Sequence, residues 1–254
     1  MPLALIKKLY FSPVKSLSFS YSRNLKIKKN IGIKNDRVFA FTRIINKATS
    51  LTYEAHPKKR NLNFFMALKN SPFLNKYNFM LNNNYLSFLF GKKIIKEISI
   101  KNRNDFKMIV TELMFLEKKI KKKPYLICNF DCPFFDTMPK NSVSLINMNT
   151  IEHFEKKATF QIDHRRFRGN IYVNNLKPWS EFKWINKHIS INGCLFKVIG
   201  KIPRCSATSL IPDSDFANIN LPEKLINIYG HRDFGIYLYP LTDGLINVGN
   251  TIGR

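Results

Sequence analysis

The chain has few acidic residues and few cysteines for its length. Asp and Glu together number 17 against 42 Lys and Arg, so the formal net charge is +25 over 254 residues. The four cysteines, Cys128, Cys132, Cys194 and Cys205, would suit a disulfide framework in a small secreted domain. This chain is large, however, and its N-terminal segment carries charges where a signal peptide needs an apolar core. We therefore expect reduced thiols and an unexported, cytoplasmic protein.

Long hydrophobic runs, low-complexity tracts and internal repeats are also absent. The longest apolar runs are too short to cross a bilayer, so we expect no membrane span. Hydrophobic residues make up 44% of the chain and aromatic residues 13%, enough apolar side chains to offset the entropy lost on folding. We expect a globular protein of one large or two small domains.

The excess of basic residues raises the question of a polyanionic partner such as nucleic acid. Most of that excess is Lys spread along the whole chain beside many Asn and Ile, the composition that AT-rich codons produce, and no nucleic-acid-reading motif accompanies it. The densest run, Lys118–Lys123, follows apolar residues at helical spacing from Phe106 to Ile120. Its lysines are therefore expected in the last turn of an amphipathic helix, where the helix dipole stabilises cations. We do not expect nucleic acid as a partner.

Several segments have the pattern of hairpins or short helices. Asn192-Gly193 and Asp243-Gly244 each stand between two apolar-rich arms, the preferred chemistry of a two-residue hairpin turn, and residues 77–90 show a third hairpin pattern. Helices are expected to start near Asn149 or Thr150, and at Pro222 with an end before Gly230. The sequence thus predicts an α+β chain that is mostly β, with a barrel and helices at its ends.

Five short motifs carry a resemblance to a known family: PVKS (Pro13–Ser16), DR (Asp36 and Arg37), RRFRGNIYV (Arg165–Val173), PRC (Pro203–Cys205) and FGIY (Phe234–Tyr237). In this order and spacing they resemble the MOSC family, named for the C-terminal domain of molybdenum cofactor sulfurases. Residues 1–123 are similar to the family's N-terminal β-barrel domain, and residues 124–254 to the MOSC domain itself. The resemblance implies a MOSC-type β-barrel with peripheral helices plus an N-terminal β-barrel-like domain.

The resemblance implies a molybdenum cofactor bound as molybdopterin, with Cys205 as catalytic residue and metal ligand. A thiolate is the soft anionic donor that suits such a metal, and the neighbouring Arg204 would help to keep it deprotonated. Without the resemblance, a free cysteine is more often a buried, inert thiol. The residues implied for binding the pterin and its phosphate are Lys15, Ser16, Arg37, Arg168, Asn170, Arg204 and Tyr237.

Several of these residues also have a simpler interpretation. Lys15 and Ser16 could form an ordinary turn after Pro13, Asp36 and Arg37 a surface ion pair, and Tyr237 half-buried strand packing. The segment 147–150 matches a helix start that contacts the cofactor in relatives, and it could equally be a simple N-cap. Two departures from the pattern stand out: Pro203 where the amidoxime-reducing branch commonly has Ser, and Glu54 where the family has Arg.

Two functional classes follow from the resemblance. The first is an oxidoreductase that reduces N-hydroxylated small molecules and takes electrons from a separate ferredoxin, flavoprotein or cytochrome, since no cysteine follows Cys205 to hold an iron–sulfur cluster. The second is a carrier in which Cys205 holds a persulfide sulfur or the cofactor itself for delivery. A carrier needs an exposed thiol and a metal ligand a shielded one, so the exposure of Cys205 distinguishes them. His164 could assist proton delivery, but we leave it out of the catalytic set.

Overall fold

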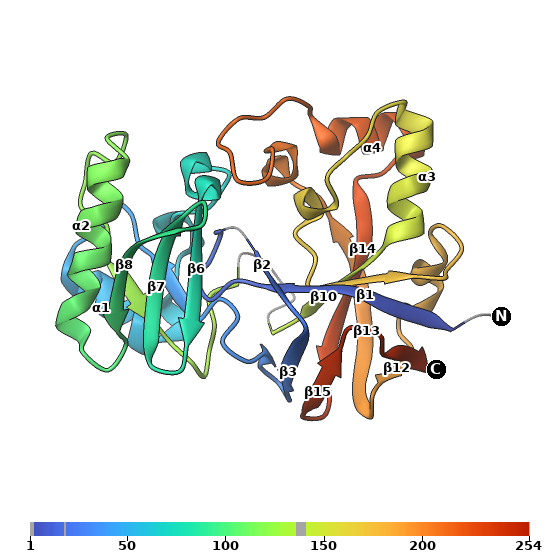
Figure 1. The fold of residues 1–254 in the computed structure, drawn as a ribbon, viewed down its shortest axis with the longest axis horizontal. Helices are drawn as coiled ribbons and strands as arrows, with labels where there is room; N and C mark the ends of the chain where they lie inside the picture. The colour runs from blue at the N-terminus through green and yellow to red at the C-terminus, as the bar shows by residue number, and fades with distance from the viewer. Residues whose placement is uncertain (1–2, 18, 136–140, 254) are drawn as a thin grey trace.

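The computed structural model describes residues 3–17, 19–135 and 141–253, and its largest sheet forms a closed β-barrel, on the right in Figure 1. Seven strands close it in the order β11-β10-β14-β13-β12-β16-β1, because β1 also pairs with β11. Their bounds are β1 Ala4–Phe11, β10 Val143–Asn147, β11 Ile171–Asn174, β12 His188–Ile191, β13 Cys194–Pro203, β14 Asp233–Pro240 and β16 Thr251–Gly253. The α+β, mostly β class and the barrel predicted from sequence are confirmed.

The barrel interior is filled by alternate residues of each strand. Along β12 and β13, Ile189, Ile191, Phe196 and Val198 are buried in the barrel core, whereas Leu195 between them is 37% exposed. This period of two is the pattern that a strand with one buried face requires. The Asn192-Gly193 turn joins the two strands as predicted, with Ile191 opposite Cys194.

Two helices cover one outer side of the barrel: α3 (Met148–Ala158) and α4 (Leu221–Tyr229) (Figure 1). Their buried residues, among them Phe154 and Leu225, join Phe234 of β14 in a second apolar cluster. Asn220 caps the start of α4, and Gly230 ends it in the left-handed conformation at φ 73°. Both helices lie where the sequence predicted them.

The rest of the chain forms smaller sheets beside the barrel. β6, β7 and β8 form a meander against α2, β5 pairs with β9, and β3 pairs with both β4 and β15, while β2 extends the barrel sheet at β1. Their bounds are β2 Ser20–Ser22, β3 Asn24–Lys28, β4 Gly32–Ile33, β5 Phe39–Phe41, α1 Lys47–Ala55, β6 Tyr77–Asn82, β7 Tyr85–Phe90, β8 Lys93–Ser99, α2 Phe106–Leu116, β9 Leu126–Cys128 and β15 Gly244–Asn247.

Two of the sequence predictions are wrong. Asp243-Gly244 does not join a hairpin, because both edges of β14 are already paired, with β10 and β13, so β15 pairs with β3 instead. The lysine run 118–123 lies beyond the end of α2 rather than in its last turn. Glu117 leaves the helix at φ −114°, ψ 84°, where its buried carboxylate accepts a hydrogen bond of 2.7 Å from the Tyr77 hydroxyl. That contact holds the chain outside the helical path.

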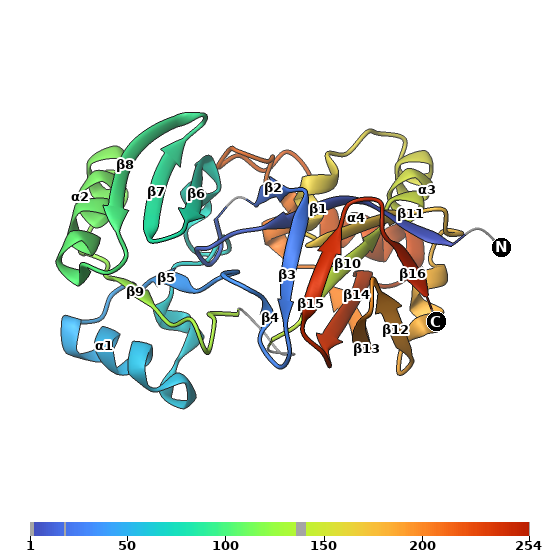
Figure 2. The ribbon, with the colours of Figure 1, turned by 60° about the horizontal axis from the view of Figure 1, so that its bottom comes forward.

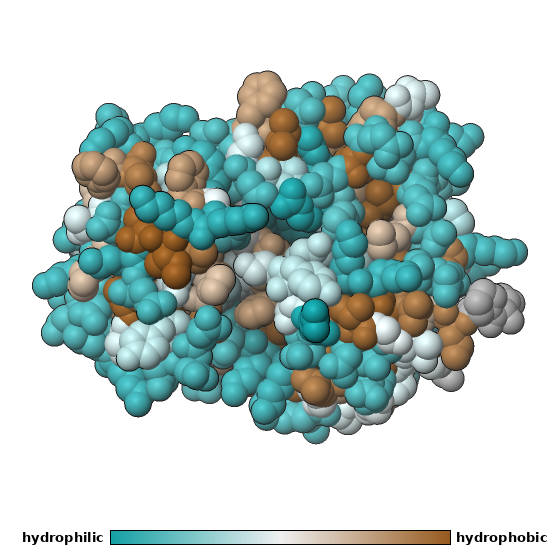
Figure 3. Space-filling model, in the orientation of Figure 1, coloured by the Kyte–Doolittle hydropathy of each residue, from teal (hydrophilic) through white to brown (hydrophobic). Residues whose placement is uncertain are grey.

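The division into residues 1–123 and 124–254 stays a prediction, and strand pairing crosses it, since β1 pairs with β11 and β16. In the described part of the chain, no helix combines the length and apolar character needed to cross a membrane. Hydrophilic residues cover most of the face seen in Figure 3, with apolar patches scattered between them.

Candidate functional site

Two arginines from distant parts of the chain meet at the ring of Phe19. Arg37 lies just before β5 and Arg168 just before β11. Their Cζ atoms are 4.9 Å and 4.7 Å from the centroid of the Phe19 ring, within range of a cation–π interaction. The Nη2 group of Arg168 also donates a hydrogen bond of 2.7 Å to the carbonyl of Leu17. The loop after β1 therefore holds together two of the residues that the sequence predicted for the cofactor.

Three of the predicted residues share a strained backbone. Ser16, Arg37 and Arg168 have φ angles of 65°, 54° and 48°, in the left-handed region that side chains with a Cβ rarely adopt. Arg37 is held there by two backbone hydrogen bonds: its N–H donates to Ser12 and its carbonyl accepts from Phe134. Strained residues of this kind persist where the surroundings fix them, and they gather at functional sites.

The site concentrates positive charge in a desolvated place. Lys15 is 1% exposed, and its burial, followed by the charges of Arg37 and Arg168, lowers the pKa of its ammonium group well below the usual value. Burial also lowers the pKa of Arg168 to about 10. One buried carboxylate, Asp36, pairs with Arg37 and accepts a hydrogen bond of 3.0 Å from the Ser12 N–H. Three cations and one carboxylate suit a phosphate-bearing ligand.

Cys205 lies beside this cluster and is exposed to solvent. It follows the end of β13 and starts a short 3-10 helix, Ser206–Ser209, and its carbonyl accepts hydrogen bonds of 3.0 Å and 2.8 Å from the N–H and hydroxyl of Thr208. Burial is the main reason that the pKa values of Arg168 and Arg204 are lowered, and the negative charge of a Cys205 thiolate acts in the opposite direction on both. The thiol is thus no buried gap-filler. By the criterion set out from the sequence, its exposure favours a carrier.

Arg204, unlike the exposed Cys205 next to it, is buried and bound to backbone carbonyls. Its side chain is buried, and its Nε and Nη1 groups donate hydrogen bonds of 2.9 Å and 2.6 Å to the carbonyls of Phe234 and Phe167, while Nη2 also contacts Phe234. The rings of Phe167 and Phe234 stack with centroids 4.0 Å apart. Arg204 therefore ties β14 to the segment before Arg168. Its role toward a cofactor stays a prediction.

A small cavity adjoins Arg168 and is lined by Tyr10, Tyr172, Arg165 and Asp213 among others. Its volume is about 20 Å³, close to the space that one water molecule needs. Pockets that hold a drug-sized ligand measure roughly 300 Å³ or more. The charges of the site fit an anionic cofactor. The cavity itself is too small for a pterin, but Lys15, Arg37 and Cys205 do not line it, so its volume does not limit the space in front of these three side chains.

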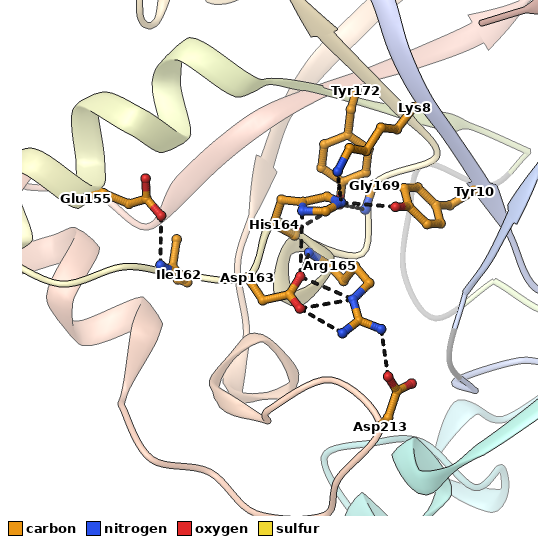
Figure 4. A network of polar contacts seen from close by, with 10 residues as sticks. All are labelled: Lys8, Tyr10, Glu155, Ile162, Asp163, His164, Arg165, Gly169, Tyr172 and Asp213. Carbon is orange, nitrogen blue, oxygen red and sulfur yellow. Dashed lines mark hydrogen bonds and ion pairs between the residues drawn. The ribbon is translucent and has the colours of Figure 1, made fainter. Parts of the chain in front are cut away.

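A polar network surrounds the cavity (Figure 4). The Tyr10 hydroxyl lies 3.1 Å from Nε2 of His164, and the Tyr172 hydroxyl donates a hydrogen bond of 2.9 Å to the carbonyl of His164. Burial, then the charge of Lys8, lowers the pKa of His164. Arg165 pairs with Asp213 at 2.6 Å, which joins the segment after Cys205 to the segment before Arg168.

One family model matches part of the chain. Residues 135–253 match the MOSC domain. This matched segment, residues 135–253, is called the MOSC segment below. It covers the strands from β10 to β16 with α3 and α4 and contains Arg168 and Cys205, whereas Lys15 and Arg37 lie outside it. MOSC domains in general bind a molybdenum cofactor or act in sulfur- and molybdenum-related functions.

Two solved structures are similar to the chain. The YuaD protein from Bacillus subtilis is 11% identical, with 99% of this chain and 94% of that chain covered and a TM-score of 0.46. YiiM from Geobacillus stearothermophilus is 16% identical, with 43% of this chain and 52% of that chain covered and a TM-score of 0.35. No curated protein matches the sequence.

Asn170 of the MOSC segment connects three barrel strands. Its side-chain oxygen accepts hydrogen bonds of 3.1 Å and 2.8 Å from the N–H and hydroxyl of Ser144 on β10. Its side-chain nitrogen donates a hydrogen bond of 3.1 Å to the carbonyl of Tyr10 on β1. These contacts assign the side chain to the barrel, and its predicted contact with a cofactor stays a prediction.

Replacing Asn170 with Ala should destabilise the protein by about 2–4 kcal/mol, because Ser144 and Tyr10 would keep buried polar groups without their partner. Chemical denaturation of the two proteins measures the difference. Asn174→Ala is the control. It lies at the half-buried end of β11, the strand that directly follows Asn170, and it should change stability much less. Equal stability of wild type and Asn170→Ala would contradict the structural role.

Tyr237 lies on β14 between Ser144 of β10 and Gly200 of β13. Tyr237 is partly buried. Burial of Arg204 lowers the pKa of its guanidinium, and the largest opposing contribution comes from the charge of the Tyr237 phenolate. The MOSC segment thus places Tyr237 within electrostatic range of Arg204. Its predicted contact with the cofactor stays a prediction.

The start of α3 already has an anion. Asn147 and Thr150 donate hydrogen bonds of 2.9 Å and 3.0 Å to the carboxylate of Glu181, which is fully buried and whose pKa burial raises. A carboxylate at a helix N-terminus is stabilised by the helix dipole. The side chains of Asn147 and Thr150, which were expected to contact a cofactor, are therefore already hydrogen-bonded to Glu181.

The two departures noted in the sequence lie apart from each other. Pro203 ends β13 opposite Asp233. Glu54 lies on α1, where it pairs with Arg103 and accepts a hydrogen bond of 3.2 Å from the N–H of Cys128. In the part of the chain that is described, no group of three or more His, Cys, Asp or Glu side chains could hold a metal ion by itself.

Sequence reasoning missed Phe19, Tyr10 and Tyr172. Phe19 stands in an ordinary run of Ser and apolar residues, and its contact with two guanidinium groups depends on loops that are far apart in sequence. Tyr10 and Tyr172 lie on β1 and β11, and they meet only because these strands close the barrel. A barrel model built from the strand pattern could have found the tyrosines, but not Phe19.

Proposed function

We propose that this protein binds a molybdenum cofactor of the molybdopterin type and reduces N-hydroxylated small molecules with electrons from a separate protein. The observation that carries the proposal is that Arg37, Arg168 and Lys15 gather within electrostatic range of one another, with the thiol of Cys205 near Arg168. A phosphate needs cationic donors, and a soft metal needs a thiolate. The MOSC match supports this pairing of groups.

In this proposal the chain's own residues bind and orient. Arg37 and Arg168, which both contact the ring of Phe19, would bind the phosphate of the pterin, and the buried Lys15 lies within electrostatic range of both. Cys205 would provide the thiolate ligand, and the guanidinium of Arg168 lies within electrostatic range of its sulfur. The cofactor, when bound, supplies the two-electron redox chemistry. The overall reaction consumes two electrons and two protons, breaks the N–O bond and releases water.

Elemental analysis tests the proposal directly. Protein purified from cells that make the cofactor should contain molybdenum and pterin in stoichiometric amounts. Cys205→Ala should lose at least about tenfold in retained metal, because its only protein ligand is removed. The matched control, Cys132→Ala, changes a thiol that contacts Arg60 and is not one of the proposed site residues, and it should retain metal like the wild type.

A folded wild type without molybdenum or pterin would overturn the proposal. If metal is present, reduction of an amidoxime driven by reduced viologen tests the second half. If the protein contains the cofactor but reduces no N-hydroxylated compound, the proposed cofactor site is supported and the proposed reaction is contradicted.

A second candidate, a sulfur carrier, is favoured by the exposure of Cys205. In that function the Cys205 thiolate attacks the outer sulfur of a donor persulfide, forms a new S–S bond and releases the donor thiolate. Mass spectrometry after incubation with a persulfide donor should then show one added sulfur atom, absent in Cys205→Ala. Absence of the added sulfur in the wild type would remove this candidate.

A further inference from the structure

A second cavity lies in the part of the chain that precedes the MOSC segment. It has a volume of about 430 Å³ and lies between α1, α2 and the segment 123–127, which includes the start of β9. Figure 2 shows β9 running between the two helices. It shares no lining residue with the small cavity beside Arg168.

The cavity exists because two apolar clusters diverge on either side of β9. Successive residues of a strand point to opposite faces, so Leu126 packs with α2 in one cluster and Ile127 packs in the other with Tyr53 of α1. Both helices contact β9, and the wedge between them stays open. Its floor is apolar, formed among others by Phe106 and Val110.

The rim of the cavity is basic. Lys47, Lys107 and Lys123 line it, and Lys47 and Lys107 stand in the first turns of α1 and α2, where the helix dipole is positive. Within residues 3–17, 19–135 and 141–253, no ion-pair partner lies within reach of these three ammonium groups.

The one carboxylate of the cavity is already neutralised. Glu54 forms an ion pair with Arg103 and accepts the N–H of Cys128, while Nη1 of Arg103 contacts the Cys128 sulfur at 3.0 Å. The pair thus cancels the charges of Glu54 and Arg103. Three positive charges remain around an apolar floor.

We propose that this cavity binds a small organic anion, with a flat apolar body on Phe106 and Val110 and a carboxylate or phosphate facing Lys107 and Lys123. The volume lies in the range of pockets that enclose most of a drug-sized ligand. The apolar floor provides burial, and the lysines select the anionic head group. This site is independent of Cys205 and of any cofactor bound there.

Calorimetric titration with three probes of one shape tests the proposal: 2-naphthoate, its neutral isostere 2-naphthamide, and 2-naphthyl phosphate. We expect one saturable site for at least one of the two anions and binding of the amide weaker by about tenfold, since the amide offers no charge to the lysines. The anion that binds more tightly identifies the head group. Binding should weaken as salt increases.

Charge reversal locates the site. Lys107→Glu and Lys123→Glu should each weaken binding of the preferred anion by about five- to tenfold. The matched control is Lys122→Glu, which makes the same change at an exposed neighbour that does not line the cavity, and it should stay within about twofold. Val110→Phe should abolish binding by filling the cavity, provided that circular dichroism shows a folded protein.

Three results would overturn the proposal. The first is the absence of saturable binding of both anions. The second is equal affinity for naphthoate and naphthamide. The third is equal affinity of wild type, Lys107→Glu and Lys123→Glu, and this result stays decisive even if Val110→Phe does not fold.

Discussion

Gly235→Ala should destabilise the protein by about 3–5 kcal/mol, because the new Cβ has no place in the barrel wall. Gly235 has φ 82°, and a Cβ there would lie 2.5 Å from the carbonyl oxygen of Leu145 and 2.5 Å from Cδ1 of Ile146. The carbonyl belongs to β10, which pairs with β14 at this point, so it cannot yield without loss of the pairing. The Cβ would also lie 3.3 Å from Nη2 of Arg204, which holds the carbonyl of Phe234.

Thermal unfolding measures this effect as a decrease in Tm of about 10 °C. The matched control is Gly200→Ala on the adjacent strand β13, where nothing lies within 4 Å of the added Cβ and φ is not positive. It should change Tm by no more than about 2 °C. Similar Tm values for wild type and Gly235→Ala would show that the barrel wall tolerates a side chain at this point.

Lys15→Met should make the protein more stable near neutral pH, by about 1–3 kcal/mol, while it removes part of the anion site. Burial, then Arg37 and Arg168, lowers the pKa of the Lys15 ammonium in the folded protein well below the unfolded value of 10.5. As pH falls below 10.5, the unfolded chain takes up a proton that the folded protein resists. Between pH 10.5 and the folded pKa, each decrease in pH therefore lowers the free energy of unfolding of the wild type relative to that of Lys15→Met. Above pH 10.5 this pH-dependent difference disappears.

Denaturation of both proteins between pH 6 and pH 11 measures this difference, and Lys7→Met, which replaces an exposed lysine of β1, is the control. Phosphate at constant ionic strength should stabilise wild type and have less effect on Lys15→Met, since a bound anion offsets the repulsion between the cations. A less stable Lys15→Met at neutral pH would mean that favourable contacts of the ammonium outweigh its burial.

The glycine of FGIY illustrates how far the sequence could go. The motif pointed to a functional family, and the structure gives Gly235 a physical role: it lets β14 approach β10 beside Arg204. Asn170 of FRGN likewise holds β10 and β1 together. Both residues support the barrel wall next to the site, and a motif alone does not distinguish that role from contact with a ligand.

Side-chain periodicity predicted the elements that depend on local sequence. The turn at Asn192-Gly193, the hairpin at residues 77–90 and the helices α3 and α4 lie where alternation and capping residues placed them. The pairing of β15 was wrong, because the choice between β14 and β3 depends on which edge is free in the completed barrel. The end of α2 was wrong because Tyr77, far away in sequence, holds Glu117.

The sequence by itself determined the mostly β, α+β class with a barrel, the hairpin at Asn192-Gly193 and the positions of two helices, and it named the cations and the thiol as candidates. Only the tertiary structure decided that Arg37 and Arg168 share the ring of Phe19, that Arg204 is occupied by backbone carbonyls, and that Cys205 is exposed. The physical reason is that alternation and capping act between near neighbours in the chain. Burial, charge repulsion and ring contacts arise between loops that meet only once the barrel has closed.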